Sequence, residues 1–288
     1  MSTAIFPVFD VKRALCVLAL ILAAGVSATA VKAQIIGLHD GNSTASVNLG
    51  SQAGMYSWTI NGQNQLNQQW FWYRVDGDPT GQHSIDTLTL SSYLANANSL
   101  NATYTLGNSF NVNLAYTLSG GLAGGNDFSS DITENITINN LSSSPLSFHF
   151  YQYSDFALAG SVGGESAQIF QSGGFFTKAN VVKALNQVAE TIDQPLANEA
   201  EADITPNTLN RLNSGAPYTL NNTVFQGPDA THDATWALEW DFTIAGNGSV
   251  DVLKDKKLSV VPIPEPGTIA FLSVGLGILA LRRSRRRA

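Results

Sequence analysis

Apolar and polar residues alternate along much of the chain between residues 34 and 260. In the stretches 110–118, 132–138 and 236–244, almost every second residue is large and apolar, and most residues between them are polar. A period of two is typical of a β-strand with one buried and one exposed face. Clusters of Gly, Asn and Pro separate these runs and mark turns. The pattern therefore predicts a mainly β body, an antiparallel β-sandwich.

One segment departs from this period. Val181, Leu185, Val188 and Ile192 are spaced by four, three and four residues, which is the spacing of one face of an α-helix. A Thr-Pro pair further along the chain has the composition of a second helix start. We therefore expect a short helical insertion over about residues 179–213 that packs on the sandwich or caps it.

The N-terminal end has the order of parts of a secretory signal peptide. A basic pair precedes the apolar run 14–26, and small residues follow it up to Ala33 and Gln34, where we expect signal peptidase to cut. An uncleaved anchor is the alternative, but the run is short for a bilayer core of about 30 Å. Residues 1–33 are thus predicted to be a signal helix that is removed, and residues 34–259 the exported body.

The C-terminal end combines three features. Pro264-Glu265-Pro266 comes first, and the apolar stretch 268–281 follows it. As a helix, that stretch would be about 21 Å long at 1.5 Å per residue, which is thin for a transmembrane helix but tolerable with local bilayer thinning. The tail ends in five arginines: Arg282, Arg283, Arg285, Arg286 and Arg287. Positive charge holds both chain ends in the cytoplasm, so the body lies across the inner membrane.

This order of motif, apolar helix and arginines resembles the PEP-CTERM sorting signal of Gram-negative bacteria over about residues 261–288, within a predicted tail segment 260–288. The resemblance implies that an exosortase, an integral-membrane cysteine protease, recognises Pro264, Glu265 and Pro266 and removes the tail. It also implies that the arginines stop transfer and that the body reaches the cell surface or the exopolysaccharide matrix of a biofilm. Ser284 interrupts the basic run and is a small departure. An ordinary tail anchor is the alternative.

The composition limits the partners and sites that the exported part of the chain can have. Charged residues make up 13% of the chain, against about 25% in an average domain. The formal net charge is −7, and the body is more acidic still because the arginine cluster lies outside it, so a nucleic-acid partner is not expected. The one cysteine, Cys16, lies in the first apolar run. Signal-peptide cleavage before Gln34 would remove this cysteine, and the mature protein would have no disulfide and no thiolate metal site.

Motifs of catalysis are absent from the sequence. We find no nucleophile elbow, metalloprotease helix motif, phosphate loop or dinucleotide fingerprint. The four histidines are far apart in sequence, and we expect His149 to face solvent and His232 to lie in a polar loop. Two oxygen-rich groups could take Ca²⁺, but acidic turns are common without it; they are Asp76 with Asp78, and Asp127 with Asp131 and Glu134. We therefore predict no catalytic residues, no metal and no cofactor.

Aromatic side chains offer one candidate binding surface. Tyr151 and Tyr153 share a strand face with His149, while Trp70 and Trp72 share another. Exposed rings beside amides and carboxylates could stack on sugars of an extracellular polysaccharide, and packing inside the protein is the alternative. We expect a non-enzymatic surface or matrix protein. The alternatives are a carbohydrate-binding module or adhesin, and a secreted hydrolase with paired carboxylates.

Overall fold

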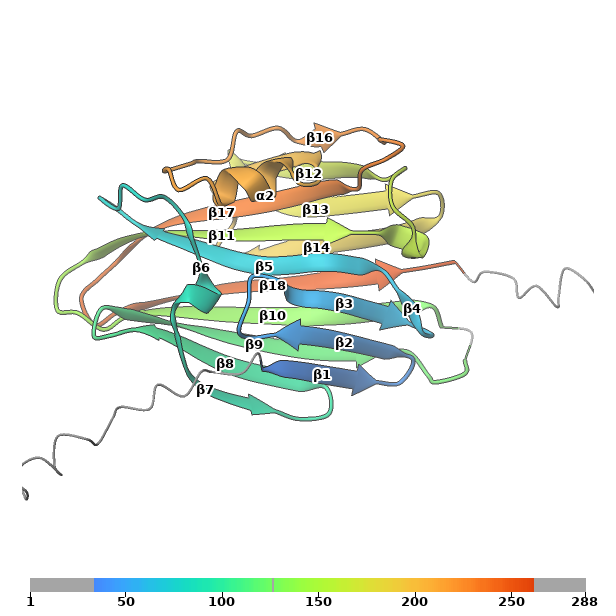
Figure 1. The fold of residues 1–288 in the computed structure, drawn as a ribbon, viewed down its shortest axis with the longest axis horizontal. Helices are drawn as coiled ribbons and strands as arrows, with labels where there is room; N and C mark the ends of the chain where they lie inside the picture. The colour runs from blue at the N-terminus through green and yellow to red at the C-terminus, as the bar shows by residue number, and fades with distance from the viewer. Residues whose placement is uncertain (1–33, 126, 262–288) are drawn as a thin grey trace, which may run out of the picture. The chain divides into compact units, whose positions relative to one another are not determined.

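The computed structural model describes residues 34–125 and 127–261, and these form two β-sheets that lie face to face (Figure 1). Strand pairs are antiparallel apart from β3 with β5. The prediction of a mainly β sandwich is confirmed. The predicted signal helix, the sorting motif, the transmembrane helix and the arginine cluster lie outside the described residues. Within the described part, no helix is long and apolar enough to cross a membrane.

The first sheet, called sheet A, has the order β1-β2-β3-β5-β11-β17-β15. Short strands β4 (Gln63–Asn64) and β6 (His83–Ser84) pair with β3 and β5. The bounds of the others are β1 Ile35–Asp40, β2 Ser43–Asn48, β3 Gly54–Ile60, β5 Leu66–Val75, β11 Leu146–Phe156, β15 Glu199–Ile204 and β17 Ala234–Ile244.

The second sheet, sheet B, has the order β16-β12-β13-β14-β18-β10-β9-β8-β7, so β18, the last of the described strands, lies inside the sheet. Its strands are β7 Thr89–Ala95, β8 Ser99–Leu106, β9 Phe110–Gly120, β10 Ser129–Asn140, β12 Ser166–Ser172, β13 Phe175–Lys183, β14 Asn186–Gln194, β16 Phe225–Gln226 and β18 Ser249–Ser259. The described helices are short: η1 Ile85–Thr87, η2 Leu158–Gly160 and α2 Asn207–Leu212.

The alternating residues found in the sequence build the layer between the sheets. Every second residue of β9 and β10 is buried. On β17, Trp236 and Trp240 are fully buried, as their alternation predicts, whereas Phe242 is only half-buried. Glu239, between these positions, is buried as well. The middle of β17 is therefore covered on both faces.

The predicted helical insertion is wrong. Residues 179–194 belong to the hairpin of β13 and β14, and only α2, six residues long, is helical in the stretch 179–213. Val181 pairs directly with Val188 across this hairpin, and Leu185 is 78% exposed at its turn. β-Branched residues at alternate positions favour strands, and each hairpin strand finds a partner in sheet B.

Candidate functional site

A histidine surrounded by carboxylates lies on the outer face of sheet A. His149 of β11 pairs with Arg74 of β5 on one side and with Asp241 of β17 on the other. Directly paired residues of neighbouring strands point to the same side of a sheet. Glu239, two residues before Asp241 on β17, therefore shares this face. The turn after β5 adds Asp76.

The imidazole contacts a carboxylate through each ring nitrogen. Nε2 of His149 lies 2.8 Å from Oδ1 of Asp76, and Nδ1 lies 2.5 Å from Oδ1 of Asp241. Oε1 of Glu239 is 3.6 Å from the same Nδ1. His149 lies on the outer face, as the alternation predicts. Its side chain is only 18% exposed, because acidic groups enclose most of it.

These contacts favour the charged imidazolium. The hydrogen bonds to Asp241 and Glu239, helped by Asp76, raise the pKa of His149 to about 10. In turn, the hydrogen bond with His149 lowers the pKa of Asp76. Burial raises the pKa of Glu239, whose Oε2 accepts a hydrogen bond from the Leu220 amide at 2.9 Å. At neutral pH the site therefore holds a proton donor beside proton acceptors.

The group opens onto a pocket of about 170 Å³. Its walls come from the ends of β11 and β17 and from the turn after β5, and its lining residues are Asp76, Ser147, Phe148, His149, Asp241, Phe242 and Thr243. A second hollow, of about 300 Å³, lies on sheet B among residues of β8, β9 and β10 such as Asn101, Asn113 and Asn135. Its lining has no titratable side chain, whereas the first pocket has Asp76, His149 and Asp241.

His149, Glu239 and Asp241 could also hold a metal ion. One ligand atom from each lies within 4.8 Å of the others, and imidazole with carboxylates suits several divalent metals. The imidazole must be neutral to coordinate a metal, so the proton that the carboxylates stabilise on His149 would have to leave first. The sequence prediction of no metal did not consider this group.

The predicted glycan platform is not exposed. Tyr151, Tyr153, Trp70 and Trp72 are all fully buried, although the register does place Trp72 opposite Tyr151 and Trp70 opposite Tyr153. Their polar atoms contact segments that cover them. Trp72 Nε1 donates to Asn213 Oδ1 at 3.0 Å, Trp70 Nε1 donates to Asp86 Oδ1 at 3.1 Å, and Tyr151 OH donates to the Tyr218 carbonyl at 3.1 Å.

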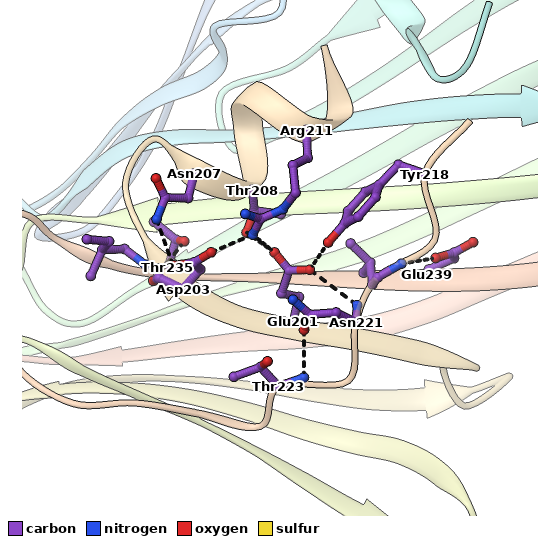
Figure 2. Close-up of polar contacts among 12 residues, drawn as sticks. Glu201, Asp203, Asn207, Thr208, Arg211, Tyr218, Asn221, Thr223, Thr235 and Glu239 are labelled. Atoms are coloured by element: carbon purple, nitrogen blue, oxygen red, sulfur yellow. Dashed lines mark hydrogen bonds and ion pairs between the residues drawn. The ribbon is translucent and has the colours of Figure 1, made fainter. Parts of the chain in front are cut away.

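Among the carboxylates that hold this cover, the buried Glu201 makes the most contacts (Figure 2). Glu201 of β15 accepts hydrogen bonds from Thr208, Arg211 and Tyr218, and from the Asn221 amide at 3.2 Å. Thr208 and Arg211 belong to α2, while the other two donors follow it. These bonds fix the segment 207–221 over sheet A, which is why the aromatic face could not stay open.

The other histidine and oxygen groups form local contacts. The Asp78 carboxylate accepts hydrogen bonds from the amide and the hydroxyl of Thr80. The Asp229 carboxylate accepts the equivalent pair from Thr231. His232 lies beside Asp229 at 3.0 Å in an exposed turn. The remaining oxygen group is dispersed: Asp127 binds Ser129, whereas Glu134 points into the protein and is fully buried.

Sequence reasoning missed Glu239 and Asp241 as partners of His149. Both residues alternate with the large apolar residues of β17. From the sequence we therefore expect them to face solvent. Ninety-two residues separate His149 from Asp241. The pairing of β11 with β17, which brings them together, has no local sequence signal.

Comparison with solved structures finds the same fold in sugar-related enzymes. A putative aldose 1-epimerase from Escherichia coli K12 matches with a TM-score of 0.50 at 10% identity, over 80% of this chain and 99% of that protein. A bacterial glucoamylase solved with acarbose matches with a TM-score of 0.52 at 9% identity, over 82% of this chain but 32% of the enzyme. No protein-family model and no curated protein matches the sequence.

Identities this low show a common fold and nothing finer. That fold nevertheless contradicts the prediction of a non-enzymatic surface protein. The prediction rested on the absence of local catalytic motifs, whereas the acidic groups around His149 are assembled from strands far apart in the sequence. A site of this kind leaves no local signature.

Proposed function

We propose that this protein is an enzyme that transfers protons at the anomeric centre of a sugar, in the manner that the name aldose 1-epimerase describes. The observation that carries the proposal is that each ring nitrogen of His149 is hydrogen-bonded to a carboxylate at the edge of an open pocket. The fold shared with a putative aldose 1-epimerase supports it. Interconversion of sugar anomers through the open chain is helped by an acid at the ring oxygen and a base at the anomeric hydroxyl, and the pocket supplies one of each.

The reaction follows from the contacts of the two ring nitrogens. Nδ1 of His149 stays bound to Asp241, which fixes the plane of the ring. Nε2 faces Asp76, whose side chain is 59% exposed, so a sugar can enter on this side. Nε2–H then donates its proton to the ring oxygen of the sugar, and Asp76 accepts the proton of the anomeric hydroxyl. The bond from the anomeric carbon to the ring oxygen breaks, and the open aldehyde can reclose on either face.

Binding itself would strengthen the acid. The pKa of His149 is raised by three carboxylates, with the hydrogen bonds to Asp241 and Glu239 contributing most. A sugar oxygen that replaces Asp76 at Nε2 removes one of these stabilising bonds, so the pKa falls in the complex and proton transfer becomes easier. In the free protein all three carboxylates remain in place, so His149 keeps its proton at neutral pH.

Anomer exchange of galactose and glucose, followed by NMR with the full chain, tests the proposal. We expect exchange faster than in buffer, and we expect His149→Gln to slow it by about 10²–10⁴-fold because the acid is lost. The kcat/KM should decline as the pH rises toward the pKa of His149 in the free protein, near 10, and also as the pH falls far enough to protonate Asp76, whose pKa is lowered. His39, exposed on β1, provides the matched control: His39→Gln should be as active as the wild type. Exchange no faster than in buffer, or unaffected by His149→Gln, would contradict the proposal.

We also propose that the chain is exported and sorted through its C-terminal tail. Support comes from the sequence alone: the cleavage pattern at Ala33 and Gln34, and Pro264-Glu265-Pro266 before an apolar run and arginines. Signal peptidase and an exosortase would be the partners, with the inner membrane a transient location. Mass spectrometry of the cell-surface protein is expected to find a chain that begins at Gln34 and lacks the arginines. Mature molecules that mostly retain Ala288 would sink the sorting proposal.

A further inference from the structure

Four charged side chains lie in the middle of the layer between the sheets. At most 2% of each side chain is exposed. They are Lys254 and Lys256 of β18, Glu134 of β10 and Glu190 of β14. All four occupy inward positions of sheet B, where alternation would place apolar residues. Burial of so much charge is costly even when the charges balance. The cluster has no part in the proposed sugar chemistry.

A side-chain amide from the opposite sheet completes this cluster. Gln152 of β11 is fully buried. Its Oε1 contacts Lys254 Nζ, and its Nε2 donates hydrogen bonds to Glu190 Oε2 at 2.7 Å and to Ser154 Oγ at 3.0 Å. A lysine amine therefore lies against a carboxamide, and the nitrogen of that amide lies against a carboxylate.

We propose that Lys254 and Gln152 join in an intramolecular isopeptide bond, with Glu190 carrying a proton from the attacking nitrogen to the leaving one. Glu190 is placed for both contacts. Its Oε1 lies 3.5 Å from Lys254 Nζ and 3.2 Å from Lys256 Nζ, while its Oε2 accepts a hydrogen bond from Gln152 Nε2. Trp236 Nε1 also donates to Oε2 at 2.7 Å and fixes the carboxylate.

The two lysines differ in a way that makes Lys254 the nucleophile. Burial lowers the pKa of Lys254, and the attraction of Glu134 only partly offsets this. Burial acts in the same direction on Lys256, but there Glu134 and Glu190 outweigh it and raise the pKa. A neutral amine is needed for attack on a carbonyl carbon. Lys254 is also the lysine whose Nζ contacts the Gln152 amide.

The reaction balances within the cluster. Lys254 passes one proton to Glu134, which its Nζ contacts. The free amine attacks Cδ of Gln152, a carbon–nitrogen bond forms, and the attacking nitrogen gives its next proton to Glu190. Glu190 passes that proton to Nε2, the bond from Cδ to Nε2 breaks, and ammonia leaves. Lys256 then remains charged beside one ionised and one protonated glutamate, so the cluster stays neutral and no oxidant or second substrate is required.

Such a bond would connect β11 of sheet A with β18 of sheet B across 102 residues of sequence. The described residues contain no cysteine, so no disulfide can take this role there. A covalent tie between the layers restricts the unfolded chain in the way that a disulfide does.

Peptide mass spectrometry of the purified, denatured full chain tests the proposal. We expect one cross-linked species that contains Gln152 and Lys254 and is lighter than its two peptides together by one ammonia, with no cleavage after Lys254 by trypsin. Glu190→Gln keeps the shape of the side chain and should abolish the cross-link. Lys257→Met, at an exposed position of the same strand, should leave it intact.

Two results would overturn the proposal. Wild-type protein whose two peptides are recovered separately at their full masses has no such bond, whatever the variants do. A cross-link that forms equally in a folded Glu190→Gln protein would remove Glu190 from the reaction. A circular dichroism spectrum of each variant establishes that it is folded before the masses are compared.

Discussion

Glu134→Ala is expected to destabilise the protein by about 3–5 kcal/mol. Without Glu134 the proposed bond lacks its proton acceptor, so Lys254 and Lys256 both stay charged and buried beside one carboxylate, that of Glu190. The Glu134 carboxylate contacts Lys254 and lies 2.6 Å from Lys256 Nζ. A loss of this size is a large part of the about 5–15 kcal/mol that stabilises most domains. Urea denaturation followed by tryptophan fluorescence measures the loss.

The same strand supplies the control for this prediction. Asn135 is the next residue of β10 and points to the exposed face, so Asn135→Ala should change the free energy of unfolding by less than about 0.5 kcal/mol. If Glu134→Ala were as mild as Asn135→Ala, the cluster would have to be solvated, contrary to the burial of its four charges.

Trp240→Ala is expected to cost about 3–5 kcal/mol, because it leaves a large cavity in the core. The indole is fully buried, its ring centroid lies 6.1 Å from that of Phe150, and its Nε1 donates to the Pro195 carbonyl at 2.9 Å. Denaturant melts at a fixed protein concentration measure this effect.

Phe242→Ala is the matched comparison, since Phe242 is only half-buried two residues further along β17. It should cost clearly less than Trp240→Ala, because the surface it removes from the core is smaller. A cost below about 1 kcal/mol for Trp240→Ala would mean that β17 is not the core strand that its burial indicates.

Local alternation predicted the strands well but could not resolve the hairpin of β13 and β14. Val181 and Val188 are seven residues apart, which is two helical turns and also the separation that pairs them across a tight hairpin. The deciding feature is the turn, where Ala184 adopts a φ of 53°. A non-glycine residue in that region is uncommon and leaves no reliable mark in a single sequence.

The candidate site shows the same limit at longer range. Alternation placed His149, Tyr151 and Tyr153 correctly on one face of a strand, yet their exposure depends on segments that arrive from elsewhere in the chain. Glu201 and its donors cover the tyrosines, while Asp76 and Asp241 enclose the imidazole. Glu134 did give a local signal, because it occupies an inward position between Ile132 and Ile136. A charged residue there indicates a buried partner without saying which one.

The place of β18 inside sheet B has a consequence for the order in which the protein can fold. Ser259 at its end pairs with Ser129 of β10 and with Gln187 of β14. Until β18 is synthesised, β10 and β14 both present unpaired edges, and the two halves of sheet B have no strand between them. Contacts between such distant residues form slowly. Sheet B therefore cannot close as one sheet until β18 has been synthesised, although the strands on both sides of it are made earlier.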